Sequence, residues 1–210
     1  MKKYFFGIVI IFLCNPSNGQ IKLPRLINNG MILQRDQPVT IWGWSSANES
    51  IQLRLDNEVY QTVAHSDGTW SIQLKAHTAG GPHTLQLKAS NEINLSDILF
   101  GDVWVCSGQS NMELWMGRLK YKYKDEIAKA NNSSIRQFLV PDAYDFKNPK
   151  QDMAAGEWLA VNSKNILDFS GVAYFFAKEI NEKYHIPIGI INSALGGSPA
   201  QSWISEEGLQ

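Results

Sequence analysis

The sequence predicts an α/β protein with an antiparallel β-sandwich at its N-terminal side, followed by an α/β domain that contains parallel strands. Short segments of the first hundred residues alternate apolar and polar side chains, as Ile-Gln-Leu-Arg-Leu at 51–55 does. Further on, nearly continuous apolar runs at 102–106 and 188–192 enclose a helical pattern at 171–184. This strand–helix–strand order is typical of parallel sheets whose strands are covered on both faces.

The predicted sandwich comprises residues 20–97. The segment at 39–44 is rich in β-branched and aromatic residues, and those at 70–74 and 83–87 alternate with period two. Asp-, Asn- and Gly-containing turn signals separate these segments, and short strands at this spacing suggest a sandwich. We expect three tryptophans to belong to its core rather than to a sugar-binding platform: Trp42, Trp44 and Trp70.

The predicted α/β domain comprises residues 98–210. Its first strand, 102–106, should be buried on both faces, and 135–140 and 188–192 should be further strands. Ser170 is a suitable N-cap for a helix over 171–184. The expected buried face of that helix follows a four-residue spacing: Val172, Phe176, Ile180 and Tyr184, with Ala173 and Ala177 beside them.

Residues 1–19 have the layout of a secretory signal peptide. Two lysines precede an apolar run, and small residues follow it, which predicts cleavage after Gly19 and a secreted or periplasmic protein. A lipoprotein anchored through Cys14 is the alternative, although Leu13 before it is bulky for such a site. The apolar run is short for a membrane span, so we expect none after cleavage.

Composition excludes several classes of function. The formal net charge is −1, and no basic stripe indicates nucleic-acid binding. Cys106 is the single cysteine beyond the predicted signal peptide, so an internal disulfide is not expected. Neither a metal-ligand spacing of Cys and His nor a Gly-rich phosphate loop is present, and we therefore predict no metal and no cofactor. The oligomeric state is left open.

Ser110 is the candidate nucleophile, because it follows the predicted buried strand within Ser-Gly-Gln-Ser-Asn-Met at 107–112. In open α/β sheets, active sites lie beyond the carboxyl ends of the strands. Gly108 would permit a sharp turn, and a helix beginning near Ser110 would direct free N–H groups at an oxyanion. From spacing alone, Ser110 could equally be a helix cap. Met112 departs from the Gly-x-Ser-x-Gly pattern of α/β-hydrolases.

The segment at 101–112, Gly-Asp-Val-Trp-Val-Cys-Ser-Gly-Gln-Ser-Asn-Met, closely resembles the first motif block of sialate O-acetylesterases. These enzymes belong to the SGNH hydrolases, whose nucleophilic serine lies in this block. Met31-Ile-Leu-Gln-Arg35 and Trp42-Gly-Trp44 resemble the family's N-terminal β domain. Gly189 to Ala200, with Trp203, resembles its second block, and the resemblance extends from about residue 24 to the end.

The resemblance implies a role for several residues. Ser110 would be the nucleophile, and a glycine of the second block would donate its N–H to the oxyanion: Gly197, with Gly196 as the reserve. A tight turn that requires glycine is the structural alternative there, and both interpretations can hold together. Gln109 and Asn111 are candidate substrate-binding residues. The substrate would be an O-acetylated carbohydrate, sialic acid first, with acetylxylan or another polysaccharide as the alternative.

Two elements of the family pattern do not occur in this sequence. One is a Gly-Glu-Ser-Asn-like block, and the other is an Asp-x-x-His motif that supplies the base and its orienting acid. The four histidines, His65, His77, His83 and His185, are more typical of surface positions. The chain therefore resembles the N-terminal portion of such an esterase with a truncated hydrolase domain, inactive alone. A truncated, non-catalytic carbohydrate-binding or scaffold module is the rival interpretation.

Overall fold

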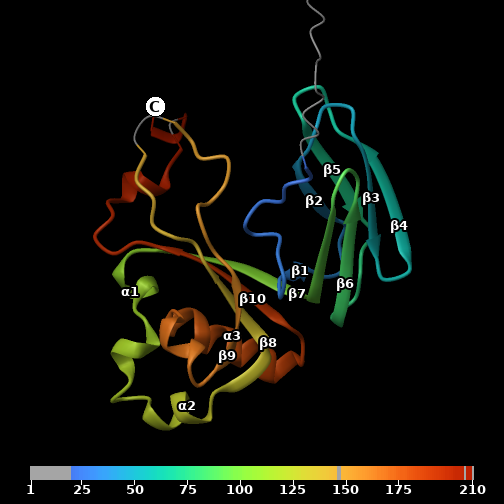
Figure 1. The fold of residues 1–210 in the computed structure, drawn as a ribbon. Coiled ribbons are helices and arrows are strands. Elements are labelled where there is room, and N and C mark those ends of the chain that lie inside the picture. Colours follow the sequence, from blue (N-terminus) through green and yellow to red (C-terminus); the bar gives the residue numbers. More distant parts are fainter. Residues whose placement is uncertain (1–19, 146–147, 206, 210) are drawn as a thin grey trace, which may run out of the picture.

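The computed structural model describes residues 20–145, 148–205 and 207–209 of the chain; the predicted signal peptide lies outside this range. One long strand, β7 (Glu92–Gly108), runs from an all-β half into a half that carries the helices (Figure 1). The other strands are β1 (Ile32–Gln34), β2 (Val39–Trp44), β3 (Ser50–Leu55), β4 (Glu58–Val63), β5 (Thr69–Leu74), β6 (Gly80–Lys88), β8 (Asn131–Leu139), β9 (Trp158–Asn162) and β10 (Ile188–Ala194). The helices are α1 (Ser110–Glu113), α2 (Lys124–Lys129) and α3 (Gly171–Tyr184), with 3-10 turns η1 (Met116–Leu119), η2 (Asn165–Asp168), η3 (Ala200–Trp203) and η4 (Glu207–Leu209).

The β half contains two sheets that share one core, and their strands pair antiparallel except for β1, which is parallel to β7. β2 pairs with β5, while β4, β3, β6 and the first part of β7 follow one another in the larger sheet. The alternation at 51–55 buries Ile51, Leu53 and Leu55 and leaves Arg54 exposed. Trp70 is buried with them, as predicted, but Trp42 is 40% exposed and packs edge-on against Trp44. Trp42 is therefore not a core residue.

The second half is built on three parallel strands. β10 lies between β7 and β8 and is parallel to both, and β9 adds an antiparallel edge. The predicted helix over 171–184 is confirmed as α3, and the hydroxyl of Ser170 accepts a hydrogen bond from the Ala173 N–H at 3.2 Å. Strand, helix and strand thus follow in the expected order. The architecture is a mixed α/β fold in which strands predominate.

Two predictions about burial are wrong, and they concern neighbouring surfaces. The buried face of α3 consists of Ala173, Tyr174 and Ala177, whereas Phe176 is 38% exposed. Trp104 of β7, predicted to be buried, is 45% exposed and contacts Phe176 edge-on. No described residue covers this face completely, which explains why an apolar pattern alone overestimated burial. The other apolar residues of these elements that remain exposed are Val105, Val172 and Tyr184.

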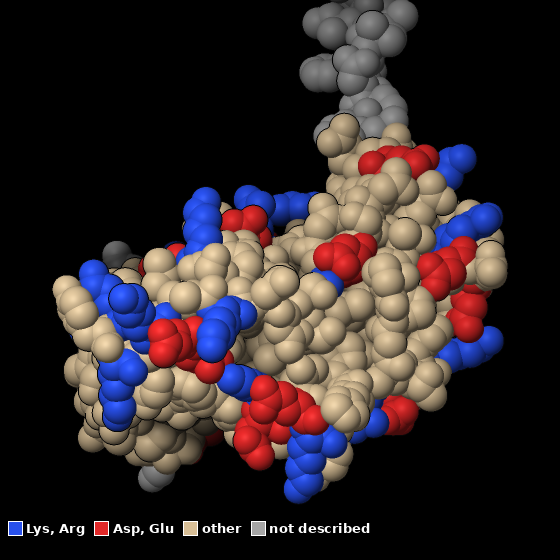
Figure 2. Space-filling view, turned by 90° about the horizontal axis from the view of Figure 1, so that it is seen from below, with Lys and Arg blue, Asp and Glu red and all other residues tan. Residues whose placement is uncertain are grey.

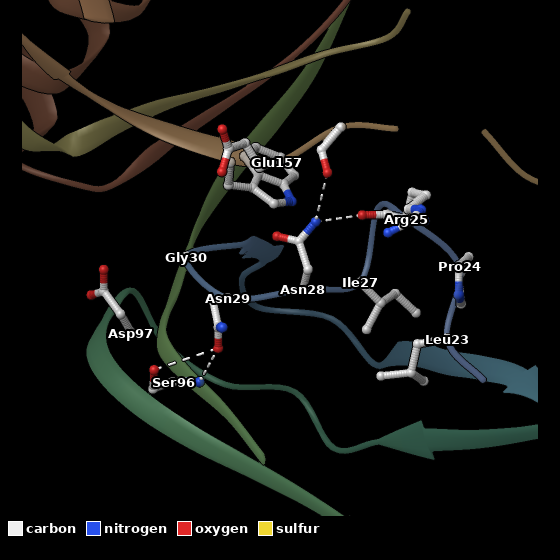
Figure 3. A pocket seen from close by; sticks show the side chains of 12 residues that line it. Leu23, Pro24, Arg25, Ile27, Asn28, Asn29, Gly30, Ser96, Asp97 and Glu157 are labelled. Atoms are coloured by element: carbon white, nitrogen blue, oxygen red, sulfur yellow. Dashed lines mark hydrogen bonds between the residues drawn. The ribbon is translucent and has the colours of Figure 1, made fainter. Parts of the chain in front are cut away.

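Arg136 of β8 connects the two halves through hydrogen bonds and an ion pair. Its buried guanidinium donates to the Gly30 carbonyl at 2.7 Å and pairs with the Asp97 carboxylate at 2.9 Å. A cavity of about 590 Å³ lies at this seam (Figure 3). The side chain of Asn28 bridges the Arg25 and Gly156 carbonyls there, and Asn29 accepts the Ser96 N–H at 2.8 Å. The polar groups of this cavity are thus used to join the two halves.

The predicted boundary between residues 97 and 98 lies within β7, so one continuous strand belongs to both halves. Among the described residues, no helix is long and apolar enough to span a membrane.

Candidate active site

Ser110 lies at the carboxyl end of β7, where the backbone turns into α1. Gly108 has φ +133°, a conformation that side chains rarely adopt, and Gln109 is extended before the helix begins at Ser110. The N-cap is Gln109, and no side chain caps this helix, so Ser110 does not act as a cap. Its side chain is exposed, and neither its hydroxyl nor its N–H has a hydrogen-bond partner among the described residues. The hydroxyl is therefore presented to solvent, as a nucleophile must be.

The loop after β10 is held against α1 by three hydrogen bonds. The Leu195 N–H donates to the Gly108 carbonyl at 2.9 Å, and the Gln109 side-chain amide donates to the Ser198 carbonyl. The carboxylate of Glu113 accepts the Gly196 N–H at 2.9 Å. These bonds tie Ser110 and the two glycines into one unit.

Gly196 and Gly197 differ in what they can offer to a ligand. A Cβ at Gly196 would lie 2.3 Å from the Glu113 carboxylate and 3.6 Å from the Ser110 Cα, so a side chain there would displace that carboxylate. Its N–H is already bonded to Glu113. Gly197 is exposed at φ +79°, and its N–H has no acceptor among the described residues. Of the two, Gly197 has the free donor.

A small cavity of about 200 Å³ opens beside Ser110. Gln109 is exposed but directs its amide at the loop after β10, whereas Asn111 faces the cavity. The residues that line the cavity are Ser110, Asn111, Glu113, Leu114, Trp115 and Arg118.

A buried polar network beneath α1 was not anticipated from the sequence. The Gln137 side-chain oxygen accepts the Ser170 N–H at 3.1 Å and the Asn192 amide at 3.4 Å, and its amide donates to the Asp168 carbonyl at 3.0 Å. The Ser170 hydroxyl lies 3.6 Å from the sulfur of Met112 in α1. The network links β8, β10 and α3 to the helix that carries Ser110. Polar residues inside otherwise apolar strands were the available signal.

A larger cavity of about 690 Å³ lies at the same edge of the sheet. It is lined by the carboxyl ends of β8 and β10, by Lys22 and Arg25 of the β half, and by Trp203. The indole N–H of Trp203 donates to the Ser198 hydroxyl at 2.9 Å, and that hydroxyl donates to the Leu195 carbonyl at 2.7 Å. Trp203 is thereby tied to the same loop as Gly197.

None of the four histidines is placed beside Ser110. His65, His77 and His83 belong to the β half; His83 contacts Asp56 at 2.6 Å, and His77 stacks on Phe100. His185 follows the C-terminal end of α3 at the amino end of β10. Seven residues of that strand separate it by roughly 20 Å from the edge where Ser110 lies. No histidine of this chain can therefore take the serine proton.

The described residues offer neither a metal site nor a reactive thiol next to Ser110. Among the described residues, no group of three or more His, Cys, Asp or Glu is arranged to hold a metal ion. Cys106 is buried in β7, and burial raises the pKa of its thiol, which disfavours the reactive thiolate.

Residues 100–209 match the family described as carbohydrate esterase, sialic acid-specific acetylesterase. The chain belongs to this family. Human sialate O-acetylesterase is 30% identical over 204 residues, which cover 88% of this chain and 39% of that protein. Rat sialate O-acetylesterase is 28% identical over an alignment that covers 97% of this chain and 41% of the rat protein. The chain thus spans about two fifths of the curated relatives it matches.

A solved structure supports the same relationship. A carbohydrate acetylesterase from Xanthomonas citri superposes with a TM-score of 0.87 at 39% sequence identity. The alignment covers 90% of this chain and 43% of that one. The two halves described here therefore reproduce the N-terminal two fifths of a carbohydrate esterase fold.

Proposed function

We propose that this chain forms the N-terminal part of a carbohydrate O-acetylesterase, a serine hydrolase that releases acetate from O-acetylated sialic acid. The observation that carries this proposal is the Ser110 hydroxyl at a strand end, which has no hydrogen-bond partner among the described residues and lies close to the loop of Gly196 and Gly197. Family membership supports the reaction, and the relatives are named for the same activity.

In the proposed reaction, the Ser110 oxygen attacks the carbonyl carbon of the acetyl ester. The N–H groups of Gly197 and Ser110 hold the oxyanion that forms, and Asn111 contacts the substrate in the cavity. The serine proton passes to a histidine, which returns it to the departing sugar hydroxyl, and water then releases acetate from the serine. In the family, that histidine and its orienting acid belong to an Asp-x-x-His motif, which does not occur in these 210 residues.

The proposed domain organisation follows the sequence boundaries. Residues 20–97 form a β-sandwich domain, and 98–210 form the N-terminal part of an SGNH-type, flavodoxin-like hydrolase domain. The shared core of the two sheets and the parallel order of β7, β10 and β8 support this division. Since β7 is continuous, we propose that the two domains act as one rigid unit.

The main test is Ser110→Ala in a version that carries the complete hydrolase domain. Removing such a nucleophile can cost on the order of a million-fold in turnover. The assay is release of p-nitrophenol from its acetate, and Ser107→Ala is the matched control because Ser107 is an exposed serine near the end of β7, three residues before Ser110. We expect the Ser107 variant to keep normal turnover. Retention of most turnover by Ser110→Ala would remove the assignment.

We also propose that the protein is secreted or periplasmic after cleavage behind Gly19. N-terminal mass spectrometry of secreted material should find Gln20 as the first residue. A lipidated Cys14 at the N-terminus would overturn this prediction.

A second candidate function is a non-catalytic carbohydrate-binding or scaffold module. The positions of the four histidines favour it for residues 20–210 alone, because none reaches Ser110. Acetylxylan or another acetylated polysaccharide is the alternative substrate. Acetate release from both substrates by a version with the complete hydrolase domain separates these possibilities, and a module would release acetate from neither.

A further inference from the structure

The cavity beside Ser110 contains two side chains, Trp115 and Arg118, that the proposed reaction does not use. The segment that carries them is firmly anchored. Met116 is fully buried and its N–H donates to the Phe169 carbonyl at 2.9 Å, while the Gly171 N–H donates to the Leu114 carbonyl at 2.8 Å. The backbone that carries Trp115 and Arg118 is thus fixed in place beside the cavity.

Neither side chain is needed to complete the core. Trp115 is 40% exposed, and Arg118 is exposed as well. The anchor of the segment is Met116, which points inward between them. An exposed indole on a fixed backbone offers a flat apolar surface at little cost in conformational entropy.

The guanidinium of Arg118 has unused donors. It lies 5.8 Å from the centre of the Trp115 ring and forms no ion pair or hydrogen bond with any described residue. Glu113, the one acid that lines the cavity, contributes a carboxylate oxygen to the Gly196 N–H instead. A planar guanidinium with free donors matches the two oxygens of a carboxylate.

The surrounding charge also favours an anion. Lys120, Lys122 and Lys124 follow Arg118 and are all exposed. In the view from below (Figure 2), lysine and arginine side chains gather at the left end of the molecule with acidic side chains between them, and the first turn of α2 carries Asp125 and Glu126. A local excess of positive charge attracts acidic ligands.

From these observations, we propose that Trp115 and Arg118 form a specificity subsite, in which the guanidinium binds a carboxylate on the sugar that carries the ester. The Trp115 ring packs against the apolar face of the same sugar. This inference rests on the proposed function and adds the residues that would distinguish acidic sugars from neutral ones such as xylose.

The test is a binding measurement that needs no turnover. The purified chain is titrated by NMR with the methyl α-glycoside of N-acetylneuraminic acid and, separately, with the methyl ester of its carboxyl group, which removes only the charge. A hydrogen-bonded charge pair changes affinity roughly ten- to a hundredfold. We expect the acid to bind more tightly than the ester by about that factor.

Variants locate the effect. Arg118→Gln should abolish the preference for the acid, and Arg118→Lys should keep part of it, because charge remains while the two-pronged geometry is lost. Lys120→Gln is the matched control, since it removes the same charge from the same segment outside the cavity, and the preference should persist. Trp115→Ala should weaken both glycosides equally. Thermal midpoints verify that each variant is folded.

Three outcomes would overturn the proposal: equal binding of acid and ester, an unchanged preference in Arg118→Gln, or no measurable binding of either glycoside. Failure here alongside Ser110-dependent acetate release would remove only this subsite. Persistent acetate release by Ser110→Ala would instead contradict the assignment of Ser110 as the nucleophile, and the binding result would remain valid.

Discussion

The two halves of the molecule differ in how completely their apolar surfaces are covered. In the β half, both sheets bury their apolar side chains in one shared core, and Leu53 and Leu74 have no exposed surface. In the other half, Val105 is 69% exposed and Val172 is 50% exposed, on elements whose sequences predicted burial. An apolar pattern shows that a surface should be covered; whether it is covered depends on the neighbouring elements.

The candidate catalytic groups are also distributed unevenly between the two halves. The described residues contain the candidate nucleophile, the Gly197 donor and the network that positions α1, but no histidine in reach of Ser110. The β half contributes core and cavity walls without chemistry. We therefore expect the chain to fold as a framework for an esterase site whose base comes from elsewhere.

The largest expected effect is in turnover. A serine hydroxyl without a base is a weak nucleophile at neutral pH, and a general base contributes roughly a hundred- to ten-thousand-fold. The resemblance also implies an oxyanion donor from the asparagine of the Gly-Glu-Ser-Asn-like block, which does not occur in this sequence, and one missing donor costs roughly a further hundred- to thousand-fold. The turnover of residues 20–210 should therefore be lower than that of a version with the complete hydrolase domain. The expected ratio is the product of these two factors. Rapid turnover that depends on Ser110 would show that a base exists within this chain.

The next effect is in stability, and a matched pair of leucines measures it. Leu53 in the β half is fully buried, whereas Leu139 at the end of β8 is 40% exposed. Leu53→Ala should lower the free energy of unfolding by about 2–5 kcal/mol. Leu139→Ala should cost about 1 kcal/mol, because much of its surface already contacts water. Urea denaturation compares them, and equal losses would contradict the contrast between the halves.

Much of the fold was predictable from the sequence. The alternation at 51–55 and the Ser170 cap before 171–184 are local signals, and the structure confirms both. The helix face and the burial of 102–106 were not predictable, because they depend on which elements lie next to α3 and β7. The continuity of β7 was also missed, since the predicted boundary between residues 97 and 98 lies within this strand.

The site was predictable only in part. The motif around Ser110 predicted its position after a strand, and the glycines at 196 and 197 marked the neighbouring loop. Which glycine has a free N–H depended on Glu113, a contact between segments 83 residues apart that no local pattern encodes. The same holds for Arg118, which belongs to an exposed run of cations but also lines the cavity.

The central claim is that Ser110 is the nucleophile, and covalent trapping tests it most directly. A version with the complete hydrolase domain is treated with a fluorophosphonate, which reacts with activated serines, and its peptides are mapped by mass spectrometry. We predict one modified residue, Ser110, and no modification in the Ser110→Ala variant. A label on another residue, or a label that persists in Ser110→Ala, would contradict the account.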